Sequence, residues 1–263
     1  MQKTILITGA GSGIGRDAAW ALAARGHRVI ATTQTEAQAQ ALRDDSAHAG
    51  RRLEVFKLDI TQAEDRERLR DLSLDVLVNN AAIGDSGSLA EVDMARVRQV
   101  FEVNLFATLE LTQVALAGMI ARKHGTVLFV SSVAGRLPVP FLMPYGMTKF
   151  ALSAAGAALR AEMDQLGRHI QVALIEPGAI HTGFNQRMTG AKFEWMRENS
   201  YFKDQAAKMQ AREAREFRLV EARSTRSVVA CIVRAAEARR PRLRYVAPWL
   251  QGLVVRLARM VGV

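Results

Sequence analysis

The run from Pro144 to Phe150 places a tyrosine and a lysine four residues apart, at Tyr145 and Lys149. If this run is helical, the spacing brings both side chains to one face, one turn apart. An ammonium group near a phenol favours the phenolate, so we expect the pKa of Tyr145 to fall towards a range suited to proton exchange with an alcohol or ketone. Helical proteins also contain such pairs by chance, so the interpretation depends on the other motifs.

A glycine-rich turn lies close to the amino terminus. Gly9, Gly13 and Gly15 separate the apolar, strand-like run 4–8 from residues that repeat alanine and leucine at helical spacing. Strand, glycine turn and helix together allow backbone amides to approach a pyrophosphate, whose charge the helix N-terminus stabilises. The spacing differs from the standard dinucleotide fingerprint, which needs a third glycine where this chain has Ile14. A flexible turn without a ligand is the alternative interpretation.

Strand-like and helix-like segments alternate along the whole chain. Apolar runs of strand type occupy residues 4–8, 28–32, 53–57, 75–79, 126–131, 170–175 and 244–247. Helical patterns cover residues 13–25, 35–44, 61–71, 95–122, 146–167 and 226–239. This alternation predicts an α/β fold with a doubly wound parallel sheet of about seven strands and helices on both faces. No repeat or Pro/Gly-rich linker divides the chain, so we predict a single domain.

The remaining polar motifs follow the predicted strands. Asp59, Asn80, Ser132 and Pro177 each lie at or just beyond the end of one strand. Ligands of open α/β sheets bind beyond the carboxyl ends of the strands, so these residues are expected around one site. Asp59 has an alternative role as the N-cap of a helix that starts near Thr61.

In their order along the chain, these motifs resemble those of the classical short-chain dehydrogenase/reductase family. The matching pieces are Thr8-Gly-Ala-Gly-Ser-Gly-Ile-Gly15, Leu58-Asp59, Asn79-Asn-Ala-Ala82, Asn104, Ser131-Ser132, Tyr145-x-x-x-Lys149, and Pro177-Gly178 with Thr182. The resemblance implies a Rossmann fold with a cofactor and catalytic core at 4–182, a substrate lid at 183–224, and a C-terminal helix, strand and tail at 225–263. It implies an enzyme that transfers a hydride between a nicotinamide and a secondary alcohol, ketone or aldehyde.

The resemblance also implies a role for each matched side chain. Tyr145 exchanges the proton, and Ser132, thirteen residues before it, holds the substrate oxygen. Lys149 binds the nicotinamide ribose, and Asn104 holds a water that links the lysine to solvent. A satisfied core amide is the alternative for Asn104. The expected cofactor-binding residues are Gly9, Ser12, Gly13, Ile14, Gly15, Thr33, Gln34, Asp59, Ile60, Asn80, Tyr145, Lys149, Pro177, Gly178 and Thr182. Asn79 is expected to be structural.

The choice between NAD and NADP depends on the end of the second strand. Enzymes that prefer NAD place a carboxylate there, which accepts from the ribose 2′-hydroxyl and repels a 2′-phosphate. Thr33 occupies this position, and Gln34 stands where an arginine for the phosphate is usual. Ser12, Thr33 and Gln34 can donate to a phosphate. We therefore expect NADP to be favoured over NAD.

Apolar side chains near the expected site indicate a lipophilic alcohol or carbonyl substrate. The run 137–144 is apolar, and the lid carries Phe184, Met188, Phe193, Trp195, Met196, Tyr201 and Phe202. Such residues form adaptable pocket walls, although they also pack lid helices against each other. The run 177–182 resembles that of hydroxysteroid and retinol dehydrogenases through His181, for which a solvated loop histidine is an equal alternative. A regulatory or scaffold protein that binds nicotinamide without turnover is the alternative function.

Composition narrows the class of protein further. With 49% hydrophobic and 24% charged residues, the chain is typical of a globular domain. The single cysteine, Cys231, excludes an internal disulfide framework, and no signal peptide precedes the glycine turn, so a cytoplasmic protein is expected. Cys231 lies in an apolar run, where a buried structural thiol is favoured over a reactive one. No uninterrupted apolar stretch approaches the roughly 20 residues that span a bilayer.

The net charge of +10 lies mostly after residue 187 and attracts anions in general. No basic stripe with interleaved aromatics occurs, so a nucleic-acid partner is not expected. The histidines show no ligand spacing, so no metal is expected. The apolar tail 248–263 carries Arg256 and Arg259 and has three possible places: a membrane surface, the substrate pocket, or its own or a second subunit. Packing against a subunit is favoured, in a homodimer or homotetramer.

Overall fold

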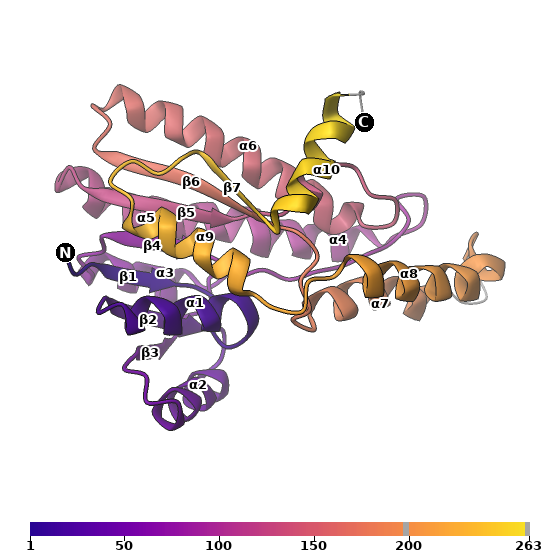
Figure 1. Cartoon of the computed structure of the whole chain (residues 1–263), viewed down its shortest axis with the longest axis horizontal. Coiled ribbons are helices and arrows are strands. Elements are labelled where there is room, and N and C mark those ends of the chain that lie inside the picture. Colours follow the sequence, from indigo (N-terminus) through magenta and orange to yellow (C-terminus); the bar gives the residue numbers. More distant parts are fainter. Residues whose placement is uncertain (197–199, 261–263) are drawn as a thin grey trace.

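The structure is a computed structural model of the whole chain and describes residues 1–196 and 200–260, without the side chain of Trp195. Its centre is one seven-stranded parallel sheet in the order β3-β2-β1-β4-β5-β6-β7 (Figure 1). The strands are β1 (Thr4–Ile7), β2 (Arg28–Thr33), β3 (Glu54–Lys57), β4 (Val76–Asn79), β5 (Gly125–Val130), β6 (Ile170–Pro177) and β7 (Arg244–Ala247). The predicted doubly wound sheet is therefore confirmed, and each predicted strand agrees within two residues.

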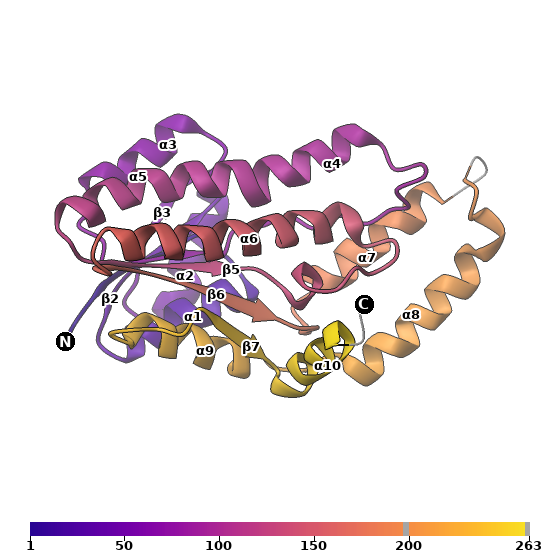
Figure 2. The same cartoon turned by 90° about the horizontal axis from the view of Figure 1, so that it is seen from above.

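Helices cover both faces of the sheet (Figure 2). One face carries α1 (Gly13–Ala24), α2 (Glu36–His48) and α9 (Arg226–Glu237), and the other carries α5 (Thr108–Ala121) and α6 (Met143–Gln165). The short α3 (Ala63–Glu67) lies beside α5. Two separate apolar clusters fill these layers, since β-strand side chains alternate between the faces. Burial on both faces explains why β4 and β5 are continuously apolar in sequence.

One long helical segment runs from Met94 to Ala121. It consists of α4 (Met94–Phe101), a π-helical stretch (Glu102–Ala107) and α5. By length and composition alone it is apolar enough to cross a membrane. Arg98, Glu102 and Glu110 interrupt it, so it is not an uninterrupted apolar stretch of the kind that the sequence lacks. In its most apolar window 44% of the residues are buried inside the molecule. A helix that covers a sheet in a protein core can be equally long and equally apolar.

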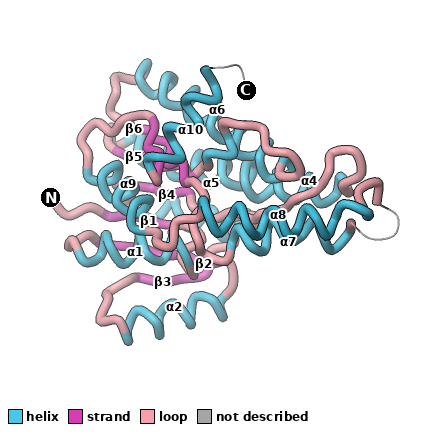
Figure 3. The backbone as a smooth tube through the Cα atoms, turned by 45° about the vertical axis from the view of Figure 1, so that its right-hand side comes forward, coloured by secondary structure: helices cyan, strands magenta, loops and turns pink. Residues whose placement is uncertain are grey.

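Beyond the sheet, α7 (Phe184–Trp195) and α8 (Ala206–Val220) form a hairpin that projects from the rest of the molecule (Figure 3). A parallel bridge between Ile180 and Ala222 closes the base of this hairpin. The predicted lid segment therefore contains two helices.

The C-terminal tail forms α10 (Trp249–Met260), which packs on its own chain through Gly252 and Val255. This agrees with the predicted packing of the tail against a subunit. Val255 also lines the central cavity, so α10 covers part of the pocket as well, which was another of the predicted places. Residues 261–263 lie outside the described residues. Cys231 is half-buried against the core, and burial raises the pKa of its thiol.

Candidate active site

The glycine turn has a geometry that only glycine permits. Gly9 and Gly13 adopt φ of 64° and 55°. A Cβ on Gly9 would lie 2.7 Å from the Cα of Ala81, and one on Gly15 would lie 2.5 Å from Nδ2 of Asn80. The backbone therefore approaches its neighbours closely, and α1 begins at Gly13 with its free amides at the turn. This shape fits the pyrophosphate of a dinucleotide.

Asn80 holds this turn in place. Its side-chain Nδ2 donates to the carbonyls of Thr8 and Gly9 at 2.9 and 3.0 Å. Its backbone N–H donates to the Thr8 hydroxyl at 3.0 Å. Asn79 points into the core instead and donates to Thr112 at 2.9 Å, in agreement with a structural role. The two neighbouring asparagines therefore differ: Asn79 is part of the core, whereas Asn80 lines the cavity, where its contact with a cofactor stays a prediction.

One cavity of about 680 Å³ connects the glycine turn with the Tyr-Lys pair. Apart from Asn104, it is lined by every residue that the sequence predicts for the site. Apart from Tyr145 and Lys149 of α6, these residues come from the carboxyl ends of β1 to β6 and the segments that directly follow them. Topology thus brings together motifs that are spread over residues 9–182.

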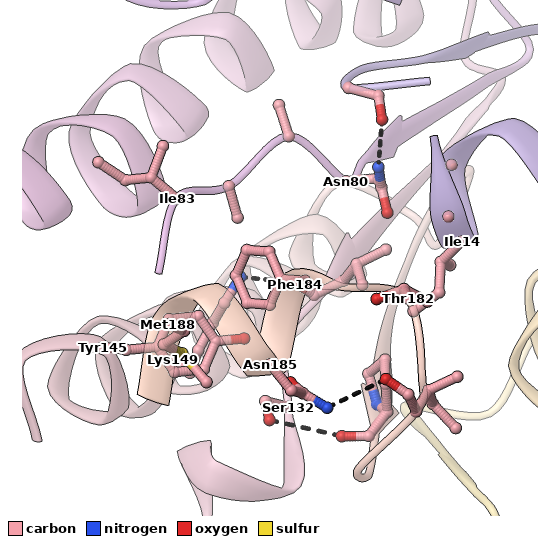
Figure 4. Close-up of a pocket in the computed structure, with 18 of the residues that line it drawn as sticks. Ile14, Asn80, Ile83, Ser132, Tyr145, Lys149, Thr182, Phe184, Asn185 and Met188 are labelled. Atoms are coloured by element: carbon pink, nitrogen blue, oxygen red, sulfur yellow. Dashed lines mark hydrogen bonds between the residues drawn. The ribbon is translucent and has the colours of Figure 1, made fainter. Parts of the chain in front are cut away.

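At the catalytic end, Figure 4 shows Tyr145 and Lys149 beside Met188 of α7. Nζ of Lys149 lies 5.5 Å from the ring centroid of Tyr145 and donates to the carbonyl of Val130 at 2.9 Å. Burial lowers the pKa of Lys149 to about 7, because the interior disfavours its charge. The α6 helix places the pair on one face, as the spacing predicts.

The expected fall in the pKa of Tyr145 was wrong for this state of the molecule. Burial raises the pKa of Tyr145, and only a hydrogen bond with Ser132 lowers it. Lys149 does not offset the burial, because its own charge is destabilised by the same low-dielectric surroundings. Tyr145 is therefore a protonated phenol, held against Ser132.

Ser132 precedes a short turn after β5 and caps it. Its hydroxyl accepts from the amide of Ala134 at 3.1 Å and donates to the carbonyl of Pro177 at 3.4 Å. Ser131 lies behind it and bonds Ser153 and the carbonyl of Lys149, away from the phenol. Both serines line the cavity, but Ser132 is the one whose side chain is hydrogen-bonded to Tyr145.

Asn104 lies outside the cavity lining, within the π-helical stretch. Its side chain accepts from the amide of Ile83 at 2.9 Å and donates to the carbonyl of Ile83 and the hydroxyl of Thr148. Thr148 precedes Lys149 on α6, so this amide ties the Ile83 loop to the helix that carries the pair. This geometry is that of a buried amide whose donors and acceptor are all paired within the core, which was the alternative role for Asn104.

The opposite end of the cavity differs from expectation in two details. The hydroxyl of Thr33 donates to the carbonyl of Thr35 at 3.0 Å, so it is not a free donor for a phosphate. Asp59 is not a helix N-cap: α3 begins at Ala63, and the Asp59 carboxylate accepts from the amide and hydroxyl of Thr61. Gln34 also donates to this carboxylate, at 3.2 Å. These hydrogen bonds outweigh burial and lower the pKa of Asp59.

The helix α7, within the predicted lid, packs directly onto Tyr145. The ring of Phe184 lies 5.8 Å from that of Tyr145 at an angle of 61°, and Met188 packs beside both. Phe217 of α8 also lines the cavity, whereas Phe193, Tyr201 and Phe202 do not: Phe202 packs on Phe141, and Tyr201 is exposed. The side chain of Trp195 lies outside the described residues.

Several cavity residues were missed by the sequence reasoning. They are Gln38 and Ala41 of α2, Asn185 and Arg187 of α7, Phe217 of α8 and Val255 of α10. The helical spacing of Phe184, Asn185 and Met188 on one side of α7 is a signal that could have found the α7 residues. Phe217 and Val255 have no such signal in the sequence. They reach the cavity only because α8 and α10 pack back against the carboxyl edge of the sheet.

His181 and its neighbours form a surface cluster beside the lid base. Nδ1 of His181 lies 2.8 Å from the carboxylate of Glu221, to which Gln186 also donates. The histidine is exposed, in agreement with the solvated alternative. Within the described ranges, no three His, Cys, Asp or Glu residues are grouped closely enough to hold a metal ion.

A parallel sheet with a glycine turn, a cavity at its carboxyl edge and a Ser-Tyr-Lys group defines a nicotinamide-dependent oxidoreductase. Residues 3–192 match the family model described as short chain dehydrogenase, and the chain belongs to this family of short-chain dehydrogenases/reductases. An uncharacterized oxidoreductase of Myxococcus xanthus is 36% identical over 68% of this chain and 72% of its own length. Retinol dehydrogenase 8 of Bos taurus is 30% identical over 92% of this chain and 80% of its own.

Solved structures agree with this assignment. A short-chain dehydrogenase from Streptomyces avermitilis superimposes with a TM-score of 0.79 at 27% identity. The match covers 99% of this chain and 94% of that one, so it includes the lid hairpin and α10. The protein is thus an oxidoreductase that depends on a nicotinamide cofactor.

Proposed function

We propose that this enzyme interconverts a lipophilic secondary alcohol and its ketone, or an alcohol and its aldehyde, with NADP as the favoured cofactor. The observation that carries the proposal is the single cavity that holds the glycine turn at one end and the Ser132-Tyr145 hydrogen bond at the other. The cavity walls beyond the phenol are mainly apolar, although α7 also contributes Asn185 and Arg187, and this supports the substrate class.

In the direction of reduction, the chain's own residues supply position and a proton. Ser132 and Tyr145 hold the carbonyl oxygen by hydrogen bonds, and the protonated phenol donates its proton to that oxygen as negative charge develops there. Lys149, with its pKa near 7, passes a proton back towards the phenolate. When bound, the nicotinamide supplies the hydride that the carbonyl carbon receives.

The apolar wall supports a lipophilic substrate. Leu137, Val139 and Leu142 come from the loop after β5, and α7 adds Phe184 and Met188. A polyol or a hydroxy acid would have to leave its polar groups unpaired against these side chains, which costs binding energy. Retinol dehydrogenase 8, a relative by sequence, acts by its name on a lipophilic alcohol.

The preference for NADP is supported by the absence of a carboxylate at Thr33. A 2′-phosphate therefore meets no like charge at this position, while Ser12 and Gln34 offer neutral donors. The Asp59 carboxylate and the engaged hydroxyl of Thr33 both work against a strong preference. We therefore propose a modest one. The homo-oligomeric state and the cytoplasmic location stay predictions.

A substrate panel tests this function. Oxidation and reduction of the nicotinamide are followed by absorbance with steroid, retinoid and aryl alcohols or carbonyls, beside polyols and hydroxy acids, and with both cofactors. Hydrophobic substrates should give the highest kcat/KM, and Ser132→Ala should lower it about a hundredfold, as loss of an oxygen-holding donor does. Ser131→Ala is the matched control. Rates on a polyol or hydroxy acid far above those on every hydrophobic substrate would contradict the substrate class.

A further inference from the structure

The C-terminal helix α10 has two apolar sides. One side faces the protein: Gly252 and Val255 are buried, and Val255 lines the cavity. On this side Gln251 accepts from the amide of Ala179 at 2.7 Å and donates to the carbonyl of Val220 at 2.9 Å. These contacts fix the orientation of α10, so its opposite side is held outwards.

The outward side of α10 is apolar as well. Six side chains that are between 44% and 80% exposed form it, here called the α10 apolar face: Trp249, Leu250, Leu253, Val254, Leu257 and Met260. The spacing of these residues places them on one continuous side of the helix. Leu219 and Val220 at the end of α8 are exposed too, and the Val220 carbonyl accepts from Gln251 of α10. Contiguous exposed apolar surface of this kind marks an interaction site.

All the charged side chains on α10 are positive. Arg256 and Arg259 are exposed, and the segment Trp249–Met260 contains no acidic residue. Arg218 and Arg223 flank the end of α8, where the carboxylate of Glu221 contacts His181 and Gln186, and the whole chain carries a net charge of +10. The complement of this surface is therefore both apolar and anionic.

We propose that the α10 apolar face docks on the surface of a lipid bilayer that contains anionic lipids. A helix of twelve residues is too short to span the roughly 30 Å hydrocarbon core, but it can lie in the interface with its apolar side buried. Tryptophan and arginine are the side chains favoured at that depth. Docked in this way, α10 lies between the bilayer and the cavity wall that Val255 forms.

A second copy of this chain fits the surface less well. In a symmetric dimer the same face meets itself, so Arg256 and Arg259 would approach their own counterparts with no acidic side chain on α10 to neutralise them. An anionic lipid surface supplies that charge and also accepts the apolar side chains. The docking does not depend on the proposed function, because it is measured without turnover.

Vesicle binding tests the proposal. The full-length protein is sedimented with phosphatidylcholine vesicles that contain or lack phosphatidylglycerol. Wild type should bind the anionic vesicles, and Leu253→Glu/Leu257→Glu should lower the partition coefficient at least about tenfold, because two apolar anchors are lost. Ile120→Glu/Leu166→Glu is the matched control: it adds the same charge to two exposed apolar positions at the opposite end of the sheet, and binding should stay close to wild type.

Charge is tested separately. Arg256→Gln/Arg259→Gln should weaken binding to the anionic vesicles and reduce its dependence on salt. Melting curves and the rate on a small soluble substrate should be unchanged in all variants, since none of these residues lines the cavity. The proposal is overturned if wild type does not bind the anionic vesicles, or if the α10 variant binds them as the control does. It is also overturned if light scattering shows that the α10 variant only dissociates an oligomer.

Discussion

Tyr145 is positioned as a proton donor by burial rather than by its lysine. The phenol stays protonated because it is buried, and Ser132 is hydrogen-bonded to it. Removing the hydroxyl in Tyr145→Phe takes away the donor and leaves the ring and its packing on Phe184 in place. We expect kcat to fall by at least about a hundredfold, a typical scale for loss of an acid-base group.

The affinity for cofactor should change little in Tyr145→Phe. Cofactor titration by fluorescence and steady-state kinetics on the best substrate are the measurements. A variant that keeps most of the wild-type activity would contradict the role of Tyr145.

Lys149 makes the stability of the protein depend on pH. Its pKa is about 7 in the folded chain and near 10.5 in the unfolded chain, so between these values the unfolded chain binds more protons. The free energy of unfolding must therefore rise with pH in this window, with a slope approaching about 1.4 kcal/mol per unit. Between pH 7 and 9 we expect a rise about 2 kcal/mol larger in wild type than in Lys149→Met.

Urea unfolding of the cofactor-free protein at each pH measures this difference. Wild type and variant contain the same other titrating groups, so the effects of those groups cancel when the two slopes are compared. The variant lacks the hydrogen bond to Val130 at every pH, so this loss does not change its slope. Parallel pH curves for wild type and variant would show that Lys149 keeps its charge in the fold.

Thr33 offers a direct test of cofactor choice. A carboxylate in Thr33→Asp would stand near the 2′-phosphate of NADP and repel it by roughly 1–4 kcal/mol, while it can accept from the 2′-hydroxyl of NAD. Wild type should therefore bind NADP modestly better, and the variant should bind NAD better. Dissociation constants for both cofactors at one ionic strength are the measurement. A tenfold preference of wild type for NAD would disprove the interpretation of Thr33.

At the scale of elements, the lid hairpin depends on a buried lysine. Nζ of Lys192 on α7 lies 2.7 Å from the carboxylate of Glu213 on α8 and donates to the carbonyl of Thr189 at 3.0 Å, with a side chain only 2% exposed. Breaking a buried pair is costly, because the remaining group loses its partner. The pair therefore holds α7 against Tyr145 through Met188.

Lys192→Met keeps the length of the side chain and removes the charge. We expect the amides of α7 to exchange hydrogen about tenfold faster, since local opening becomes easier. Exchange followed by mass spectrometry is the measurement, and Lys208→Met, an exposed position on α8, is the control. Equal exchange in both variants would mean that the apolar contacts alone keep α7 closed.

At the scale of the whole molecule, Glu176 joins the C-terminal third to the core. This fully buried carboxylate at the end of β6 pairs with Arg136, four residues after Ser132, and with Arg244 of β7. Glu176→Gln leaves two arginines without their counter-charge. We expect the free energy of unfolding to fall by about 3 kcal/mol.

Glu110, whose half-exposed carboxylate pairs with Arg66, provides the control. Glu110→Gln should cost less than about 1 kcal/mol, because its carboxylate is half exposed and solvent replaces the pair. Thermal and urea unfolding measure both variants. Similar small losses would show that the arginines of the β6–β7 edge are hydrated.

The alternation of strands and helices, the glycine turn and the order of the motifs could be predicted from the amino-acid sequence. These are local properties: an apolar strand, a residue with positive φ such as Gly9, and the spacing of Tyr145 and Lys149 each depend on a few neighbouring residues. The sheet topology then follows from right-handed crossovers and requires the carboxyl ends to meet. For this reason all the predicted site residues except Asn104 line one cavity, while their roles stay predictions.

Only the tertiary structure decided the charge states and the far walls of the site. The pKa values of Tyr145 and Lys149 depend on burial under a lid helix about forty residues further along, and desolvation is a property of the assembled interior. The place of Val255 in the cavity depends on how the tail folds back onto Gly178. Such contacts join distant segments, and no local pattern in the sequence encodes which segments meet.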